Sequence, residues 1–378
     1  MTLIPGVEAI VPTLLVAFAS AALFALLLTP VVRRFAKAFG LVDRPNPRRV
    51  NLRPIPRGGG LAVTAAFLLV AIVVVIVVDG GFIDSLVIPN SVLPGELGAL
   101  LIGGLVAAGI GFLDDVMQIR ARWQLIGQVA VAGLAIFLGV QVDAIANPFG
   151  PNTIQLPTIV AWAFTAIWII GMINSINFID GLDGLSSGIS VIAALTLGLI
   201  SLTPAVGQPF IAVLCFVLAG ALLGFLRWNF HPASIFVGTS GVMFVGYTLA
   251  VLSILGTAKV AVALLVLGVP IIDTFWIIVR RLSNRRSPFT PDRGHVHHRL
   301  LDLGLSHTQT VLLIYGITAA LAAMTFLLSG AGQVYAFLGV VVGSGLILFV
   351  LTERETVEDD LEADTYADVA PRGPDSDR

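Results

Sequence analysis

Long apolar runs separated by short polar segments recur along the whole chain. A helix needs about 20 apolar residues to cross the hydrocarbon core of a membrane, and eleven such runs can be placed. They are residues 9–29, 60–78, 97–113, 123–140, 157–173, 185–202, 209–226, 240–256, 259–279, 309–329 and 332–352. The pattern predicts an all-α polytopic integral membrane protein with about eleven transmembrane helices, built from residues 1–352.

Composition supports lipid as the solvent for most of the chain. Hydrophobic residues make up 57% of the 378 residues and charged residues 12%, whereas a soluble domain carries about 25% charged residues. Residues 353–378 are acidic and rich in Pro, Gly, Ser and Asp, so we predict a disordered cytoplasmic tail. The single cysteine, Cys215, lies in an apolar run, which excludes an intrachain disulfide and a cysteine-based zinc site.

The basic residues gather on one side of the predicted membrane. With eleven spans, 20 of the 21 Lys and Arg residues fall on the same side, and Lys259 is the exception. Because positive residues favour the cytoplasmic side, we predict a multi-pass protein of the plasma (inner) membrane with this side facing the cytoplasm. The five histidines and most aspartates share that side, and the positive-inside rule does not explain them. We therefore expect an active site on the cytoplasmic face.

Two adjacent carboxylates, Asp114 and Asp115, directly follow the third apolar run. Such a pair at the end of a span is costly unless water or a cation solvates it. Paired hard oxygen ligands suit Mg²⁺, which usually takes one or two carboxylates together with substrate phosphates. A solvated helix cap explains this motif equally well when it is considered alone.

A second acidic segment runs from Asn174 to Gly184. Asn174, Asn177 and Asp180 are spaced i, i+3, i+6, which brings three oxygen ligands near one face of a helix. Asp183 follows in a glycine-containing turn where the backbone can approach a ligand. The alternative is a polar turn between spans, but a cytoplasmic linker without a basic residue is unusual.

The longest polar segment between spans, residues 280–308, contains His295, His297, His298 and Arg299. Neighbouring arginines would repel a soft metal ion, so this combination better fits binding of a diphosphate. A basic loop touching anionic lipid explains the arginines but not the histidines.

A further basic segment, residues 43–60, precedes the second apolar run. It ends with Arg57 and three glycines, which would let a helix N-terminus come close to a phosphate. An ordinary basic loop is the alternative. Acidic metal ligands, Arg and His anion ligands and a site at the membrane together suit the transfer of a phosphorylated group onto a lipid.

These motifs resemble, in order, those of the polyprenyl-phosphate N-acetylhexosamine-1-phosphate transferases, on the WecA/TagO-like branch of the MraY superfamily. The resemblance covers roughly residues 30–310. It implies that a UDP-sugar gives its sugar 1-phosphate to undecaprenyl phosphate with release of UMP, and that Mg²⁺ is required, with Mn²⁺ as a substitute. The His-Val-His-His-Arg run at residues 295–299 resembles the UDP-GlcNAc branch. Another UDP-N-acetylhexosamine, including UDP-MurNAc-pentapeptide, is the alternative.

The resemblance also implies roles for single residues. Asp114 and Asp115 would be catalytic and serve Mg²⁺, with Asn177 as a metal ligand. The implied substrate-binding residues are Arg57, Arg122, Asn174, Asp180, Asp183, His295, His297, His298 and Arg299. Asp273 fits the pattern without a defined role. Direct in-line transfer and a two-step route through an aspartyl phosphate both agree with these residues.

One position departs from the family pattern. Relatives usually carry Gly-Asp-Ser-Gly-Ser where residues 238–242 read Gly-Thr-Ser-Gly-Val, so Thr239 replaces a metal-ligand aspartate. A hydroxyl is a weaker ligand for a hard dication than a carboxylate. The metal could still be held by Asn177 and the Asp114–Asp115 pair. The other interpretations are a divergent or impaired substrate-binding member, or a deliberate substitution.

Two other classes of function compete with the transferase. A transporter or lipid flippase would place ionisable residues near the bilayer midplane, where this sequence has almost none. A catalytically silent binding subunit is supported by Thr239.

The expected partners are a UDP-sugar, undecaprenyl phosphate and membrane lipid, without nucleic acid, and a homodimer is compatible with the sequence. Wall polymer, lipopolysaccharide and teichoic acid synthesis all stay open as pathways.

Overall fold

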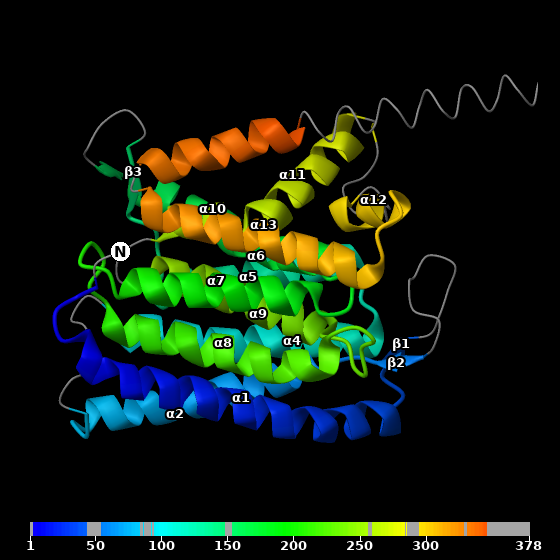
Figure 1. Ribbon diagram of the computed structural model, residues 1–378, viewed down its shortest axis with the longest axis horizontal. Coiled ribbons are helices and arrows are strands. Elements are labelled where there is room, and N and C mark those ends of the chain that lie inside the picture. The colour runs from blue at the N-terminus through cyan, green and yellow to red at the C-terminus, as the bar shows by residue number, and fades with distance from the viewer. Residues whose placement is uncertain are drawn as a thin grey trace, which may run out of the picture.

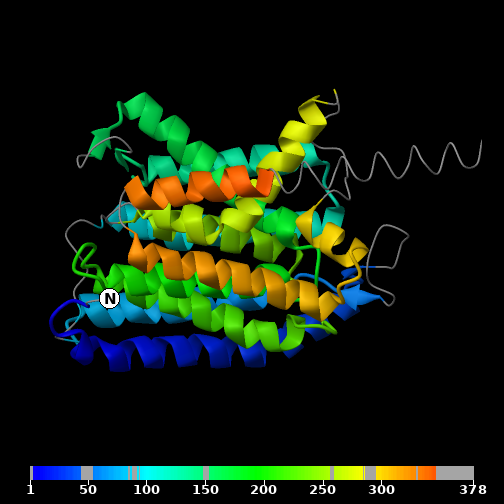
Figure 2. The same ribbon diagram turned by 45° about the horizontal axis from the view of Figure 1, so that its top comes forward.

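The computed structural model describes residues 3–43, 54–83, 86, 92, 94–147, 153–255, 259–283, 285, 295–328 and 331–345. The predicted disordered tail and residues 44–53 of the basic segment lie outside the described residues. The described chain forms a helical bundle in which most helices share one direction (Figure 1). In the turned view, α6 and α11 lean away from that direction at the top of the bundle (Figure 2).

Within the described residues, the bundle contains thirteen numbered helices, a further helix at Ala331–Gly345, one π-helical turn and two short strand pairs. The helices are α1 (Val7–Ala38), α2 (Gly60–Asp79), α3 (Pro94–Gly98), α4 (Gly104–Met117), α5 (Ala121–Phe137), α6 (Thr158–Ile179), α7 (Leu185–Ser201), α8 (Pro209–Asn229), α9 (Gly238–Ile254), α10 (Val260–Val266), α11 (Gly268–Ser283), α12 (Val296–Asp302) and α13 (His307–Leu327). The π-helical turn η1 (Ala99–Gly103) joins α3 to α4. The antiparallel strand pairs are β1 (Val42–Asp43) with β2 (Ile55–Pro56), and β3 (Ala144–Ala146) with β4 (Thr153–Gln155).

The apolar helices make the chain a membrane protein. Within the described residues, six helical segments are long and apolar enough to cross a membrane: α1, α2, α3 to α4, α6, α8 and α13. The pair α10 and α11, bent by 79°, gives a seventh if it is one span. Four apolar helices are shorter: α5, α7, α9 and Ala331–Gly345. The described part of every predicted run is thus mainly helical. The count of eleven spans stays a prediction, because these four helices are shorter than about 20 residues.

Several helices extend beyond the predicted boundaries, and in α1 and α4 the extension carries charged residues of interest. Helix α1 continues to Ala38, where the prediction ended it at residue 29, so Arg33 and Lys37 lie on its last turns. The prediction followed the loss of apolar residues, but charge does not end a helix. The chain leaves α1 at Gly40, whose φ of 71° is the left-handed conformation common after a helix. Helix α4 likewise continues to Met117, so Asp114 and Asp115 lie in its last turn.

Close backbone contacts join neighbouring helices of the bundle. A Cβ atom on Gly220 of α8 would lie 2.2 Å from the carbonyl oxygen of Phe18, and one on Gly224 would lie 2.0 Å from that of Ala22. Small residues at such crossings let membrane helices approach closely. Helix α9 is buried on all sides from Ser240 to Ile254 and packs against α2, α4 and α6. Its N-terminus is therefore fixed from several directions.

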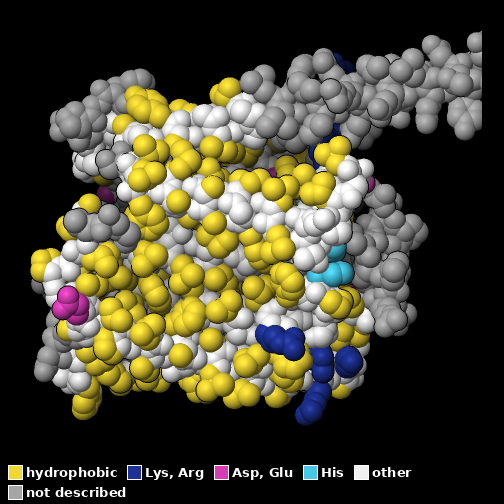
Figure 3. Space-filling view, in the orientation of Figure 1, with side chains coloured by type: hydrophobic (Ala, Val, Ile, Leu, Met, Phe, Trp, Pro, Cys, Tyr) yellow, Lys and Arg dark blue, Asp and Glu magenta, His cyan; other side chains and the backbone are white. Residues whose placement is uncertain are grey.

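The charged side chains are unevenly distributed over the surface. In Figure 3 the flank of the bundle is mainly apolar, and Lys, Arg and His side chains gather toward the end that carries α12 and β1–β2. Near the opposite end, Lys259 is buried and its Nζ donates hydrogen bonds to Gln208 Oε1 (3.2 Å) and the carbonyl oxygen of Leu255 (2.9 Å). The one-sided arrangement of charge agrees with the sequence pattern. The membrane side that this end faces stays a prediction.

Candidate functional site

The charged end of the bundle contains a cavity of about 870 Å³. We call its oxygen ligands the acidic set, which comprises Asp115, Asn177, Asp180 and Asp183. We call four nitrogen-bearing side chains of the cavity the basic set. They are Arg33 and Lys37 in the last turns of α1, Arg57 directly after β2, and His298 in α12. Asp43, Thr239, His231 and His307 also line the cavity.

Three helices meet behind the acidic set with almost no side chain between them. A Cβ on Gly60 of α2 would lie 1.9 Å from Cα of Gly241 in α9, and one on Gly111 of α4 would lie 2.4 Å from the carbonyl oxygen of Thr239. Only glycine allows these approaches. The contacts bring the last turn of α4, which carries Asp115, against the N-terminus of α9.

Asp115 caps α9 from a neighbouring helix. Its Oδ1 accepts the backbone N–H of Thr239 (2.9 Å) and its Oδ2 accepts that of Ser240 (3.0 Å). These N–H groups have no partner inside α9, and a carboxylate at a helix N-terminus also complements the helix dipole. On the other side, Arg57 Nη2 donates to the backbone carbonyl oxygen of Asp115 (2.7 Å). Asp115 is thus held rigidly while it lines the cavity.

Asp114 has a different environment from its neighbour. It is buried and is not among the residues that line the cavity. Its Oδ1 accepts the backbone N–H of Ile119 (2.9 Å), and its Oδ2 accepts the hydroxyl of Thr239 (2.6 Å). Thr239 therefore uses its hydroxyl proton to hold Asp114, and both oxygens of this carboxylate have hydrogen-bond donors.

The rest of the acidic set lies at the turn between α6 and α7. Asp180 accepts a hydrogen bond from the hydroxyl of Ser186. Burial raises the pKa of Asp180 to about 7; the Ser186 hydroxyl opposes this rise, and the charges of Asp115 and Asp183 add to it. Carboxylates that repel one another in this way favour a bound cation. Because the metal ligands that this set offers are carboxylate and amide oxygens, the set fits a hard dication such as Mg²⁺.

Helix α12 packs directly on that turn. A Cβ on Gly181 would lie 2.1 Å from Nε2 of His297. His297 is 1% exposed, and within the described part of the chain neither of its ring nitrogens has a hydrogen-bond partner. Burial lowers the pKa of His297, and His298 and His295 lower it further. His297 is therefore a neutral, buried side chain packed on the turn, and its role in substrate binding stays a prediction. His298, in contrast, reaches the cavity.

Asp273 of α11 orients the start of α12. Its Oδ2 lies 2.7 Å from Nδ1 of His295, and its Oδ1 accepts the backbone N–H of Val296 (2.9 Å). Asp273 thus caps α12 and fixes the imidazole of His295. Both His295 and Arg299 are buried, and neither lines the cavity.

Two predicted substrate-binding residues lie away from the cavity lining. Nδ2 of Asn174 donates to Oε1 of Gln128 (2.7 Å) and to the carbonyl oxygen of Ile170 (2.8 Å). The expected i, i+3, i+6 group is therefore reduced to Asn177 and Asp180 at the cavity. Arg122 is exposed, with its guanidinium 5.7 Å from the ring centre of Trp123. Substrate binding by Asn174 and Arg122 stays a prediction without support from their positions.

The sequence motifs missed several residues that line the cavity. Arg33 and Lys37 are one helical turn apart on α1, and this spacing was available as a signal. The guanidinium of Arg33 lies 5.4 Å from the ring centre of Trp228. His231 and His307 are isolated in the sequence and carry no spacing signal, yet their rings stack with centres 4.1 Å apart.

Comparisons with known proteins give consistent matches. Residues 97–257 match the family described as Glycosyl transferase family 4. The chain is 36% identical over 308 residues to a probable undecaprenyl-phosphate N-acetylglucosaminyl 1-phosphate transferase of Bacillus subtilis, covering 80% of this chain and 81% of that protein. It is 34% identical to the decaprenyl-phosphate N-acetylglucosaminephosphotransferase of Mycobacterium tuberculosis, covering 88% and 87%. An undecaprenyl-phosphate alpha-N-acetylglucosaminyl 1-phosphate transferase of Haemophilus influenzae is 32% identical, covering 81% and 83%.

Proposed function

Since the chain belongs to the polyprenyl-phosphate N-acetylhexosamine-1-phosphate transferases of glycosyl transferase family 4, we propose that it transfers N-acetylglucosamine 1-phosphate from UDP-GlcNAc to undecaprenyl phosphate. UMP is the second product, and the lipid-linked sugar begins a cell-envelope glycan. The observation that carries the proposal is a single cavity lined by an acidic set and a basic set. This combination suits a cation-bound diphosphate beside a lipid phosphate. The names of the similar proteins support N-acetylglucosamine as the sugar.

Asp115, Asn177 and Asp180 are the residues that would hold Mg²⁺, or Mn²⁺ in its place. The raised pKa of Asp180 supports this assignment, because a nearby dication would stabilise its ionised form. When bound, the cation neutralises the charge that develops on the diphosphate. Asp183 lies one turn further along the same segment and completes the negative environment.

The basic set binds the phosphate groups in this proposal. Arg33 and Lys37 lie on the last turns of α1, where a lipid phosphate can reach them from the membrane. Arg57 is fixed beside Asp115, which places its guanidinium next to the cation ligands. Guanidinium groups form strong, charge-assisted hydrogen bonds with phosphate oxygens. The two phosphorylated substrates are thereby oriented toward each other.

Direct in-line transfer is the route that these contacts favour. An oxygen of the lipid phosphate attacks the β-phosphorus of UDP-GlcNAc and forms the new P–O bond. The bond from that phosphorus to the bridging oxygen breaks, and this oxygen leaves as part of UMP. A two-step route needs a carboxylate oxygen free to attack. Asp114 is not among the residues that line the cavity. The two backbone hydrogen bonds to Asp115 weaken it as a nucleophile while leaving lone pairs that a cation can use.

The test is UMP release from the purified full chain with Mg²⁺ and a panel of donors and acceptors. UDP-GlcNAc with undecaprenyl phosphate should give the highest rate, ahead of UDP-GalNAc, UDP-MurNAc-pentapeptide and decaprenyl phosphate. Removal of divalent cations with EDTA should stop the reaction, and added Mg²⁺ should restore it. Faster turnover with UDP-MurNAc-pentapeptide would overturn the proposed donor. No UMP with any donor would overturn the proposed reaction.

A second candidate is substrate binding without turnover, and the position of Thr239 favours it. The Thr239 hydroxyl donates to Asp114, and an aspartate there would face that carboxylate and need a cation between them. If the chain is an impaired member, the wild type should bind UDP-GlcNAc without releasing UMP, and Thr239→Asp should restore release. If the chain is an active enzyme, the wild type alone should release UMP. Thr239→Asn, which supplies an oxygen without charge, is the matched control.

A further inference from the structure

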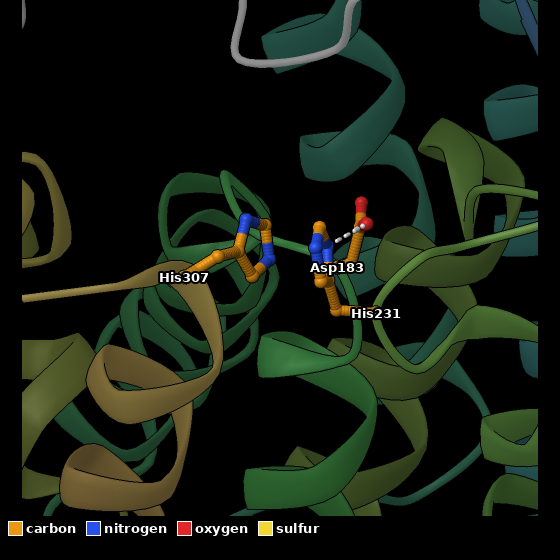
Figure 4. A group of neighbouring side chains, drawn as sticks. All are labelled: Asp183, His231 and His307. Atoms are coloured by element: carbon orange, nitrogen blue, oxygen red, sulfur yellow. Dashed lines mark hydrogen bonds and ion pairs between the residues drawn. The ribbon is translucent and has the colours of Figure 1, made fainter.

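A second group of ligands lies at the edge of the cavity, formed by Asp183, His231 and His307 (Figure 4). Asp183 is in the turn between α6 and α7, His231 follows α8, and His307 begins α13. One ligand atom of each residue lies within 4.8 Å of the others. Among the described residues, this is the one group of three or more His, Cys or carboxylate ligands that is so close.

Two of the three side chains are already aligned by contacts. Nδ1 of His231 lies 2.8 Å from Oδ2 of Asp183, and that oxygen also accepts the backbone N–H of Ala233 (3.0 Å). The rings of His231 and His307 stack at 4.1 Å with an angle of 21° between their planes. Figure 4 shows His231 between the carboxylate and the second imidazole, with the side chains arriving from separate segments.

His307 lacks a hydrogen bond of standard geometry, although its ring lies close to the backbone carbonyl of Asp183. Both of its ring nitrogens are shielded from solvent, and neither makes a well-aligned hydrogen bond among the described residues. Buried polar atoms in proteins are normally hydrogen-bonded, and leaving them unsatisfied costs free energy. An imidazole in this state next to a second imidazole and a carboxylate is suited to accept a metal ion.

We propose that Asp183, His231 and His307 bind one divalent transition-metal ion of the zinc class. Two imidazoles and a carboxylate form a ligand set that Zn²⁺ uses in proteins, with a fourth position left open. All three residues line the cavity, so water or a phosphate oxygen can occupy that position.

This site differs in chemistry from the oxygen ligands assigned to Mg²⁺. Imidazole selects transition metals, whereas carboxylate and amide oxygens suit Mg²⁺. The ion would join the α6–α7 turn, the segment after α8 and the start of α13. Because the folded protein alone brings these segments together, binding should stabilise the fold. The proposal does not depend on the identity of the transferred sugar or on turnover.

Metal binding to the purified full chain, freed of any polyhistidine tag and of bound metals, tests the proposal. Zn²⁺ titrated in a calorimeter should bind with a stoichiometry of one per chain and raise the Tm. His231→Gln and His307→Gln should each weaken binding at least about tenfold, the lower end of the loss seen when a supporting group is removed from a metal site. The matched control is His298→Gln, which changes another histidine of the same cavity and should leave the affinity within about twofold.

The visible spectrum of the wild-type chain with Co²⁺ gives an independent result that needs no variant. Intense absorption from a four-coordinate ion, displaced by Zn²⁺, supports the proposal, and the weak spectrum of a six-coordinate ion overturns it. Zinc affinity that survives both His231→Gln and His307→Gln would also overturn it. The proposal would likewise be overturned if His298→Gln removed the bound metal while His231→Gln and His307→Gln retained it.

Discussion

The acidic set and the basic set line the same cavity but are held in different ways. Asp115 is fixed by two backbone N–H groups of α9, and Asp180 by the hydroxyl of Ser186. Glycine contacts leave the backbone behind Asp115 no room to shift. In contrast, Lys37 extends as an exposed side chain from the end of α1. The acidic set is therefore preorganised, whereas part of the basic set can follow its ligand.

The difference has an energetic reason. A buried carboxylate is expensive unless donors or a cation compensate for its lost hydration. Such groups must be placed in advance, because each depends on partners that the fold supplies. A lysine or arginine near water keeps much of its hydration and costs little to leave unpaired. We therefore expect substitutions in the acidic set to reduce turnover more strongly than substitutions in the basic set.

Asp115→Asn should have the largest effect. The amide cannot carry the negative charge that a cation requires, and it offers one acceptor to the two N–H groups of α9. We expect kcat to fall at least about a hundredfold, the scale found when one group that stabilises transition-state charge is removed. UMP release and the Tm should be measured together, because the lost cap also destabilises α9.

The control for this change is Asp302→Asn. Asp302 is exposed at the end of α12 and is not among the residues that line the cavity, so its turnover should stay within about twofold of the wild type. If Asp115→Asn retains more than about a tenth of wild-type turnover, Asp115 is only a helix cap, and the acidic set is not the catalytic part of the cavity.

Arg57→Lys should have an intermediate effect. Lysine keeps the positive charge but lacks the planar fork that contacts Asp115 and a phosphate together. We expect kcat/KM to fall about tenfold, mainly through KM, as for the loss of one hydrogen bond to a charged group worth about 1.5 kcal/mol. Steady-state kinetics over both substrates measures this change.

Arg122→Lys is the matched control for Arg57→Lys. Its guanidinium lies on the Trp123 ring away from the cavity, and the change should have a smaller effect than Arg57→Lys. A loss with Arg57→Lys as large as that with Asp115→Asn would remove the distinction between the two sets.

Ser186→Ala should have the smallest effect, which is a shift in pH dependence. The pKa of Asp180 is raised from 3.8 to about 7. The contribution of this group to the free energy of unfolding therefore falls as pH rises between these two values, because the unfolded chain loses the proton first. The ionised form of Asp180 is needed for cation binding, so turnover at limiting Mg²⁺ should rise as pH increases through about 7. The Ser186 hydroxyl favours the ionised carboxylate, so its removal should move this rise to higher pH.

Ser187→Ala provides the comparison for that shift. The hydroxyl of Ser187 donates to Oδ1 of Asn229 (2.8 Å) rather than to Asp180. UMP release over a pH series on both sides of 7 should therefore move with Ser186→Ala and not with Ser187→Ala. A shift to lower pH, or the same shift in both variants, would contradict the assigned role of Asp180.

The sequence predicts helices and short motifs well because both depend on local spacing. Within the described residues, all eleven apolar runs are mainly helical, and Asp115, Asn177, Asp180 and Asp183 all reach the cavity. Helix ends were less predictable, because α1 continues past the last apolar residue through Lys37. Hydropathy reports the solvent around a residue rather than the conformation of its backbone.

Tertiary partners could not be predicted from the sequence. Asn174 has the expected spacing, but its amide pairs with Gln128 from α5. His231 and His307 meet only because the end of α8 and the start of α13 both lie beside the α6–α7 turn. The substitution at Thr239 is visible in the sequence, whereas its hydrogen bond to Asp114 is visible only in the fold. Each case joins residues that are far apart along the chain.

The chain contains only two lysines, Lys37 and Lys259. Lys37 is exposed at the cavity, whereas Lys259 is buried and donates to Gln208. Apart from the amino terminus, an amine-directed reagent should therefore modify one position, without any engineered cysteine. A fluorophore at Lys37 would sense whether a lipid phosphate or a nucleotide occupies the cavity. The scarcity of lysine thus gives this membrane protein a natural labelling position at its proposed active site.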